Sequence, residues 1–146
     1  MSNPPPKFQR IWLIQQPTIS RGGSIPDVTP VLSHLETGGE LRTLMGSGVY
    51  AHEDIMGTRR DIQSRLEDVE GPETDAFFWT GGDPIMLLLT GVALADLEFD
   101  EITWLKYERS IEKETGRRTG DFFYRPIRVD LETIEFDDFS RETGTG

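Results

Sequence analysis

The sequence predicts a single α/β domain, with a mixed, mostly parallel sheet of about five strands, two main helices and a C-terminal antiparallel hairpin. Two observations predict this class. An apolar run at 76–80, an apolar helical segment at 84–97 and a second short run at 102–107 follow one another as strand, helix and strand. A crossover of this length normally joins parallel strands. In addition, 146 residues are enough to bury one core, and the chain has no cysteine for disulfides.

The N-terminal part contains one clear strand. We expect the folded domain at 8–139, between a Pro-rich arm at 1–7 and a flexible tail at 140–146. Residues 11–14 form an apolar run with the length of a strand. Residues 18–30 contain glycines and prolines with few apolar side chains, which predicts a long loop.

The next stretch predicts a second strand and a linker. Residues 31–35 fit either a helical turn or a strand. After the glycine pair at 38–39 we expect a turn, and the strand is predicted at 40–45, where apolar and polar side chains alternate. The glycines in 46–51 predict a flexible link.

An amphipathic helix is predicted between Ile55 and Gly71. Its apolar residues fall at spacings of 7, 4 and 3, which places them on one helical face: Ile55, Ile62, Leu66 and Val69. Thr58 and Asp61 resemble a capping pair, so we expect the regular helix to begin at Arg59.

The segment at 84–97 is the most apolar part of the chain. Asp83 can cap it, and Pro84 suits the first helical position. No charged residue occurs from Pro84 to Ala95, and apolar side chains point around nearly the whole circumference. Such a helix should be covered on most sides, by its own domain or by a second copy. A homo-oligomer through 84–97 is therefore one expectation.

The C-terminal part predicts the antiparallel hairpin. A polar loop is expected at 109–121, followed by a strand at 122–131 that pairs with 102–107. Pro126 has no N–H for a sheet ladder, so this strand lies at an edge or begins at Ile127.

The charge is unevenly distributed. The net charge is −11, and residues 66–146 hold 8 Lys+Arg against 20 Asp+Glu. This excess repels a phosphate backbone, so we expect no direct nucleic-acid partner. The longest apolar run is about a dozen residues, fewer than the ~20 that span a bilayer, and the N-terminus lacks a secretory signal. We therefore expect no membrane partner and an intracellular protein.

A first candidate site is the predicted turn of Thr80, Gly81, Gly82 and Asp83. It lies between a strand end and a helix start, where α/β proteins bind ligands and where free N–H groups attract anions. It matches neither the dinucleotide fingerprint nor the Walker loop, and Asp83 would place a negative charge against a phosphate. A glycine turn followed by a helix cap is the favoured alternative.

A second candidate is an acidic partner-binding surface, for which the expected residues are Glu67, Asp68, Glu70, Asp137 and Asp138. Carboxylates spaced over a rigid fold can imitate a row of phosphates and bind a basic protein. A solvated surface without a partner is the favoured alternative. The paired carboxylates lie in polar turns and lack the cleft that acid and base catalysis requires.

The sequence assigns no catalytic residue, metal or cofactor. His34 and His52 are the only histidines, and neither has the spacing of a metal site, so we expect both at the surface. The tryptophans of three presumed strands are expected in the core: Trp12, Trp79 and Trp104. An enzyme is therefore not the favoured hypothesis.

Four short motifs carry a resemblance. G-E-L-R-T-L-M at 39–45, G-G-D-P at 81–84, W-L-K-Y at 104–107 and Y-R-P-I-R-V-D-L at 124–131 resemble a group of small uncharacterised bacteriophage proteins. In that group Trp is commoner than Tyr at position 107, and this chain also has a longer hairpin. The resemblance implies a viral origin, an α/β fold and a location in the host cytoplasm or the virion. It implies no activity.

Three functions follow as expectations. The leading one is a non-enzymatic, phage-type accessory protein that binds a host or viral protein through its acidic surface. The second is a virion component, such as a head decoration or connector, with the arm at 1–7 and the loop at 18–30 as tethers. The third is a small domain that binds or cleaves nucleotides with the turn of Gly81–Asp83.

Overall fold

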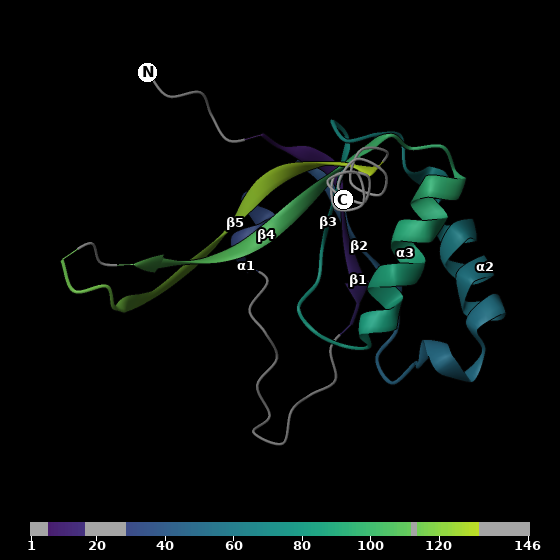
Figure 1. The fold of residues 1–146 in the computed structure, drawn as a ribbon. Coiled ribbons are helices and arrows are strands. Elements are labelled where there is room, and N and C mark those ends of the chain that lie inside the picture. Colours follow the sequence, from purple (N-terminus) through teal and green to yellow (C-terminus); the bar gives the residue numbers. More distant parts are fainter. Residues whose placement is uncertain (1–5, 17–28, 112–113, 132–146) are drawn as a thin grey trace, which may run out of the picture.

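The protein is a five-stranded mixed sheet with two helices packed on one face, as a computed structural model shows (Figure 1). The structure describes residues 6–16, 29–111 and 114–131. The strands are β1 (Phe8–Gln15), β2 (Leu35–Met45), β3 (Asp75–Phe78), β4 (Glu101–Ile111) and β5 (Arg118–Asp130). The helices are α1 (Thr29–Leu32), α2 (Ile55–Arg65) and α3 (Pro84–Asp96), with single 3-10 turns η1 (Ala51–Glu53) and η2 (Leu66–Asp68). The predicted α/β class is confirmed.

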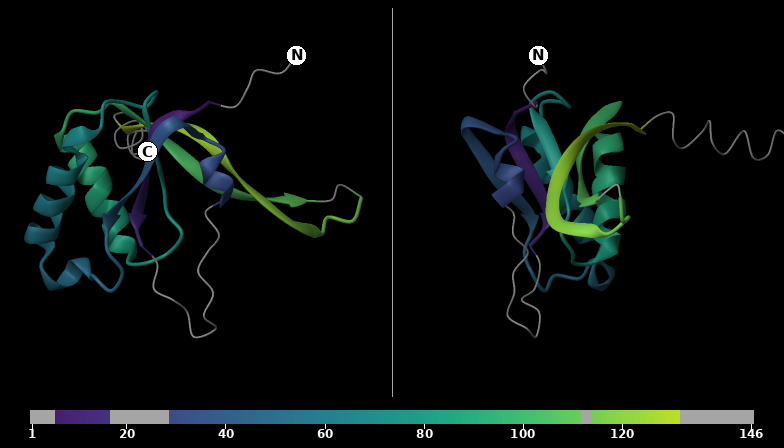
Figure 2. Two further views of the ribbon diagram at one scale, coloured as in Figure 1. Left: turned by 180° about the vertical axis from the view of Figure 1, so that it is seen from behind. Right: turned by 90° about the vertical axis from the view of Figure 1, so that its left-hand side faces the viewer.

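The strand order is β2-β1-β3-β4-β5, and all neighbours are parallel except β4 and β5. The chain moves outward from β1 to β2, then returns past β1 to β3, so the direction of winding reverses between β1 and β3. Helices α2 and α3 cover one face, and the short α1 lies on the other (Figure 2). The parallel strands therefore all end at one edge of the sheet, which we call the carboxyl edge, and begin at the opposite amino edge.

Strand β3 is the centre of the core, and all four of its residues are buried. Phe77 faces the helices and stacks on Trp12, with ring centroids 6.3 Å apart. Phe78 faces the other side and meets Tyr124 edge to face at 5.6 Å. Alternation along this short strand thus joins two hydrophobic clusters through one sheet.

The start of β2 differs from the prediction. The strand begins at Leu35 and runs through Gly38 and Gly39, where a turn was predicted. Its register to β1 shifts there, because Phe8 pairs with Leu35 but Arg10 pairs with Glu40. Extra residues bulge out of the ladder, so the glycine pair interrupts the pairing without ending the strand.

Helix α2 also begins earlier than predicted. It starts at Ile55 because the Asp54 side chain accepts a hydrogen bond from the Gly57 amide at 3.0 Å. The expected capping pair of Thr58 and Asp61 does not form the start, and Thr58 is buried. The nearer carboxylate at the true N-cap position satisfies the free N–H group.

Helix α3 is covered by its own domain on one side only. Met86 and Leu94 are buried against the sheet, but the side chains of Leu88 and Val92 are 69% and 44% exposed. The sheet and α2 cover one side of the helix, and the described residues leave its outer face open. Its own domain therefore does not cover most sides of this helix, and cover by a second copy stays a prediction.

The hairpin is longer than predicted. Strand β4 continues to Ile111 and β5 begins at Arg118, so most of the expected loop at 109–121 is strand, and the two strands form an arm that projects beyond the sheet (Figure 1). Pro126 lies within β5, an edge strand as predicted. Backbone pairing between β4 and β5 therefore extends into a segment whose polar composition predicted a loop.

His34 is buried, in contrast to the predicted surface position. Its ring nitrogens lie 3.2 Å from the Pro6 carbonyl oxygen and 2.9 Å from the Tyr124 carbonyl oxygen. His52 is exposed as predicted. Of the tryptophans, Trp12 is buried, while Trp79 and Trp104 pack on the helix-side core and remain half-buried.

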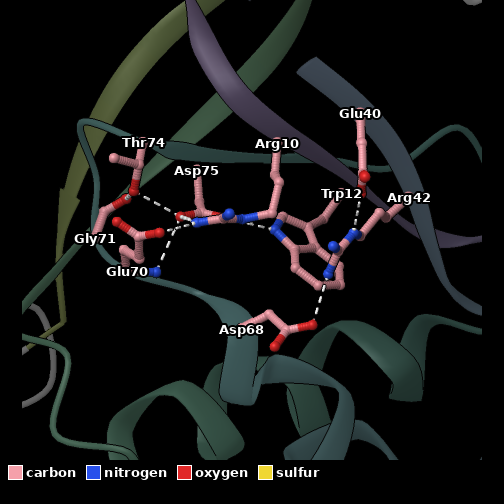
Figure 3. A network of polar contacts seen from close by, with 9 residues as sticks. All are labelled: Arg10, Trp12, Glu40, Arg42, Asp68, Glu70, Gly71, Thr74 and Asp75. Atoms are coloured by element: carbon pink, nitrogen blue, oxygen red, sulfur yellow. Dashed lines mark hydrogen bonds and ion pairs between the residues drawn. The ribbon is translucent and has the colours of Figure 1, made fainter. Parts of the chain in front are cut away.

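A buried carboxylate holds the amino edge together (Figure 3). The Asp75 side chain is fully buried at the start of β3 and accepts hydrogen bonds from two neighbouring elements. Arg10 donates from Nε at 2.7 Å, and Trp12 donates from its indole N–H at 2.9 Å. The Thr74 hydroxyl and the Glu70 amide donate to Oδ2 at 2.7 Å and 3.0 Å. All of these donors come from β1 or from the segment just before β3.

These contacts also set the charge of Asp75. Burial alone raises the pKa of its carboxyl, but the hydrogen bonds from Arg10 and the other donors outweigh this effect, so the pKa lies below its ordinary value. Asp75 is therefore ionised when the protein is folded. A second arginine completes the network, because the Arg42 guanidinium lies 5.3 Å from the Trp12 ring centre and pairs with Glu40 and Asp68.

We predict that Asp75→Asn lowers the free energy of unfolding by about 3–5 kcal/mol at pH 7, because Arg10 loses its buried counter-charge. Urea denaturation measures the change. Because the folded-state pKa of Asp75 is depressed, its contribution is present above the ordinary Asp pKa of about 3.9 and is lost as the pH falls through the folded-state pKa. Urea denaturation repeated at pH values from 7 to 2 should show this loss of stability in the original protein but not in Asp75→Asn.

Glu70→Gln is the matched control. Glu70 also pairs with Arg10, at 3.0 Å, but its side chain is 62% exposed, so its removal should change stability by less than about 1 kcal/mol. Equal effects from the two variants would contradict the prediction.

Candidate functional site

A cavity of about 340 Å³ opens at the carboxyl edge, where the winding reverses between β1 and β3. Open α/β sheets bind ligands at such a reversal, outside the carboxyl ends of the strands. Three segments distant in sequence meet there: the end of β1, the link before η1 and the turn before α3. The lining residues are Gln15, Gln16, Gly48, Val49, Tyr50, Gly82, Asp83 and Pro84.

Gln15 joins the three segments. It is the last residue of β1, and only 2% of its surface is exposed. Its amide nitrogen donates to the carbonyl oxygens of Gly46 at 3.1 Å and Val49 at 2.7 Å. Its amide oxygen accepts from the Asp83 backbone N–H at 2.7 Å. One side chain thus fixes the loop predicted to be a flexible link.

Asp83 has two structural bonds. One carboxylate oxygen accepts from the Ile85 amide at 3.1 Å and caps α3, as its position before Pro84 predicts. The other oxygen accepts from the Ala51 amide at 2.8 Å and holds η1 against the turn. The carboxylate therefore occupies the place at the helix start that an anionic ligand would take.

The predicted site residues form one turn, but they contribute unequally. Gly82 and Asp83 line the cavity, whereas Thr80 and Gly81 are not among its lining residues. Gly82 has a φ of +114°, and a Cβ there would lie 2.4 Å from the Gln15 amide oxygen. The turn therefore needs glycine both for its backbone conformation and for the close approach of Gln15.

Two buried polar atoms lie at the start of this turn and just before it. The Trp79 indole N–H and the Thr80 hydroxyl form no hydrogen bond with the described part of the chain. Native proteins leave few buried polar groups unpaired, so such groups require an explanation. The indole N–H can therefore donate one further hydrogen bond, and the hydroxyl can donate or accept one.

Tyr50 supplies an aromatic surface. Its side chain is 49% exposed at the rim of the cavity, and its ring centre lies 5.8 Å from that of His52. No motif in the sequence pointed to Gln15 or Tyr50. A glutamine that ends an apolar strand is the one signal that could have drawn attention to Gln15.

Of the five predicted acidic residues, Glu67, Asp68 and Glu70 lie at the opposite end of the molecule, the amino edge. Asp68 pairs with Arg42 at 2.7 Å, and Glu70 pairs with Arg10 at 3.0 Å. Glu67 is exposed and makes no ion pair with the described residues. The remaining two, Asp137 and Asp138, lie outside the described residues.

Further carboxylates converge on the amino edge. Both main helices run opposite to the parallel strands, so η2 and α3 end beside the starts of those strands. The connection after α3 carries exposed Glu98 and Asp100, and neither makes an ion pair with the described residues. Glu98 has a φ of +68°, a backbone conformation that residues other than glycine rarely adopt.

Other classes of site find little support in residues 6–16, 29–111 and 114–131. Within these ranges no group of three or more His, Asp or Glu side chains is placed to hold a metal ion. In the same part of the chain, no helix has the length and apolar character of a membrane span. No protein-family model, curated protein or solved structure matches the chain.

We predict that Gly82→Ala disrupts the floor of the cavity. The added methyl group would collide with Gln15, and the positive φ adds strain, so the free energy of unfolding should fall by about 1–3 kcal/mol. Chemical denaturation measures this loss. Gly46→Ala is the control, because a Cβ there meets nothing within 4 Å. If both variants are as stable as the original protein, the proposed close packing is wrong.

Proposed function

We propose that this protein binds a small, planar, uncharged ligand, such as a nucleobase or nucleoside, in the carboxyl-edge cavity. The observation that carries the proposal is the cavity at the reversal of strand order, with the buried Gln15 holding its floor. A volume of about 340 Å³ lies at the lower end of the range for ligand sites. Exposed Tyr50 at the rim offers a face on which a planar ring can stack.

The charge of the cavity supports a neutral ligand over a phosphate. The Asp83 carboxylate already accepts the Ile85 N–H at the start of α3 and adds a negative charge to the lining. A phosphate would have to displace this carboxylate or lie beside it. A heterocycle instead needs hydrogen-bonding groups, and the exposed Gln16 in the lining carries a side-chain amide that can both donate and accept.

We predict that a nucleoside binds and that Tyr50→Ala abolishes the binding. A thermal-shift series compares nucleobases and nucleosides with the corresponding monophosphates. A ligand at 100 times its Kd adds about 2.7 kcal/mol to stability, and the monophosphate should stabilise the protein less than its nucleoside. Since Tyr50 is half-exposed, its removal should leave the unliganded protein folded.

Tyr107→Ala is the matched control. Tyr107 is a tyrosine of similar exposure, 43%, and it is not among the cavity-lining residues, so its removal should leave the ligand shift unchanged. The proposal fails if no compound in the series stabilises the protein, or if the shift is insensitive to Tyr50→Ala.

A second candidate is the function favoured by the sequence, in which a phage-type accessory protein binds a basic protein through its acidic surface. One observation favours it: carboxylates gather just beyond the C-terminal end of α2 and at that of α3, where the helix dipole disfavours negative charge. Glu98 also has an unfavourable positive φ. Costs of this kind concentrate at functional sites, which supports a role of these residues in binding rather than in stability. The virion-component hypothesis stays a prediction.

We predict that the triple variant E67Q/E98Q/D100N is more stable than the original protein, by up to about 1 kcal/mol, because it removes negative charge from the C-terminal ends of the helices. It should also bind a Lys/Arg-rich peptide more weakly in fluorescence titrations, and binding by the original protein should weaken as salt rises. The control E53Q/D61N/E114Q removes the same charge from positions outside the amino edge. Equal loss of binding in both variants would show that net charge alone attracts the peptide.

A further inference from the structure

The outer face of α3 is an apolar surface that the rest of the described protein leaves open. Leu88 and Val92 are 69% and 44% exposed, and Pro84 and Ala95 on the same face are also exposed. No charged residue interrupts the helix from Pro84 to Ala95. Exposure of an apolar face to water is unfavourable, and the outer face of a surface helix normally carries polar residues.

We propose that a second copy of this chain covers the outer face of α3. In this homodimer the two α3 helices pack antiparallel across a two-fold axis that passes between residues 91 and 92. Three features of the helix support this arrangement: the sizes of the side chains that would meet, the charges at the helix ends and the neighbouring α2.

The side-chain sizes on the face are self-complementary. Residues 88 and 95 lie at equal distances from the axis, so an antiparallel pair places Leu88 against Ala95 of the second copy, and this contact occurs twice. Gly91 meets Gly91 of the second copy on one flank, and Val92 meets its equivalent on the other. A large side chain thus meets a small one at the centre, and paired glycines let the helices approach closely.

The charges favour the antiparallel over the parallel pairing. Asp96 ends α3, where the helix dipole of its own copy is unfavourable to a carboxylate. In the antiparallel pair it comes beside the first turn of the second copy's α3, the positive end of the dipole. Arg59 of α2 pairs with Asp96 and balances its charge. A parallel pair would instead bring two Asp96 carboxylates together.

The area requires more than one helix from each copy. A stable dimer buries about 800 Å² on each partner, more than one narrow helix stripe provides. Helix α2 lies beside α3 in the same layer (Figure 1), so the two helical layers can meet face to face. Helix α2 contributes Met56, which is 75% exposed, and the oppositely charged pair of exposed residues Arg60 and Asp61.

Analytical ultracentrifugation of the full chain between about 1 and 100 µM tests the proposal. We expect a concentration-dependent dimer, and Leu88→Glu should raise its Kd by about 30-fold or more, because the charge would be buried at the centre. Leu32→Glu is the control, since Leu32 is 45% exposed on α1 at the opposite face of the sheet. Circular dichroism checks that both variants remain folded.

Cysteine cross-linking tests the register independently. The chain has no cysteine, so Val92→Cys can form a disulfide only between copies. Helices about 8 Å apart would bring the two Cα atoms within the ~4.4–6.8 Å that a disulfide spans. Leu41→Cys, at a 38% exposed position on the edge strand β2, should not cross-link. A monomer at all concentrations, a dimer unaffected by Leu88→Glu, or a failure of Val92→Cys to cross-link would overturn the proposal.

Discussion

The ion pair between Arg10 and the buried Asp75 carboxylate is the interaction on which the architecture depends most. It fixes the start of β3 beside β1, and β3 is the strand that contributes buried residues to both hydrophobic clusters. An ionised carboxylate in a core is costly unless donors surround it. The donors here come from β1 and from the segment before β3, so the pair also favours one strand register over its alternatives.

Parallel pairing divides the molecule into two functional ends. Because the strands share one direction and the helices return against it, the carboxyl edge gathers Gln15, Tyr50 and Asp83 around a cavity. The amino edge gathers the helix C-termini and their carboxylates. The two proposed functions therefore belong to opposite ends, and a ligand in the cavity would leave the acidic surface accessible.

The fold also leaves one surface incomplete. An apolar stripe on α3 contributes nothing to the core of a single copy, while the same helix buries Met86 and Leu94 on its inner side. A helix with apolar residues on both sides fits a layer between two sheets. The proposed dimer places the helical layers of both copies between their two sheets.

Local patterns in the sequence were enough to predict the class, the strand-helix-strand unit around 76–107, the cap at Asp83 and the edge position of Pro126. Each of these features depends on residues that are neighbours in the sequence, so its periodicity or its capping residues can be recognised there. The role of Gln15, the burial of His34, the ion pairs of Asp68 and Glu70 and the exposure of Leu88 were not predictable in this way. They depend on which distant segments meet, and that was settled by the strand order and by the side of the sheet that each helix covers.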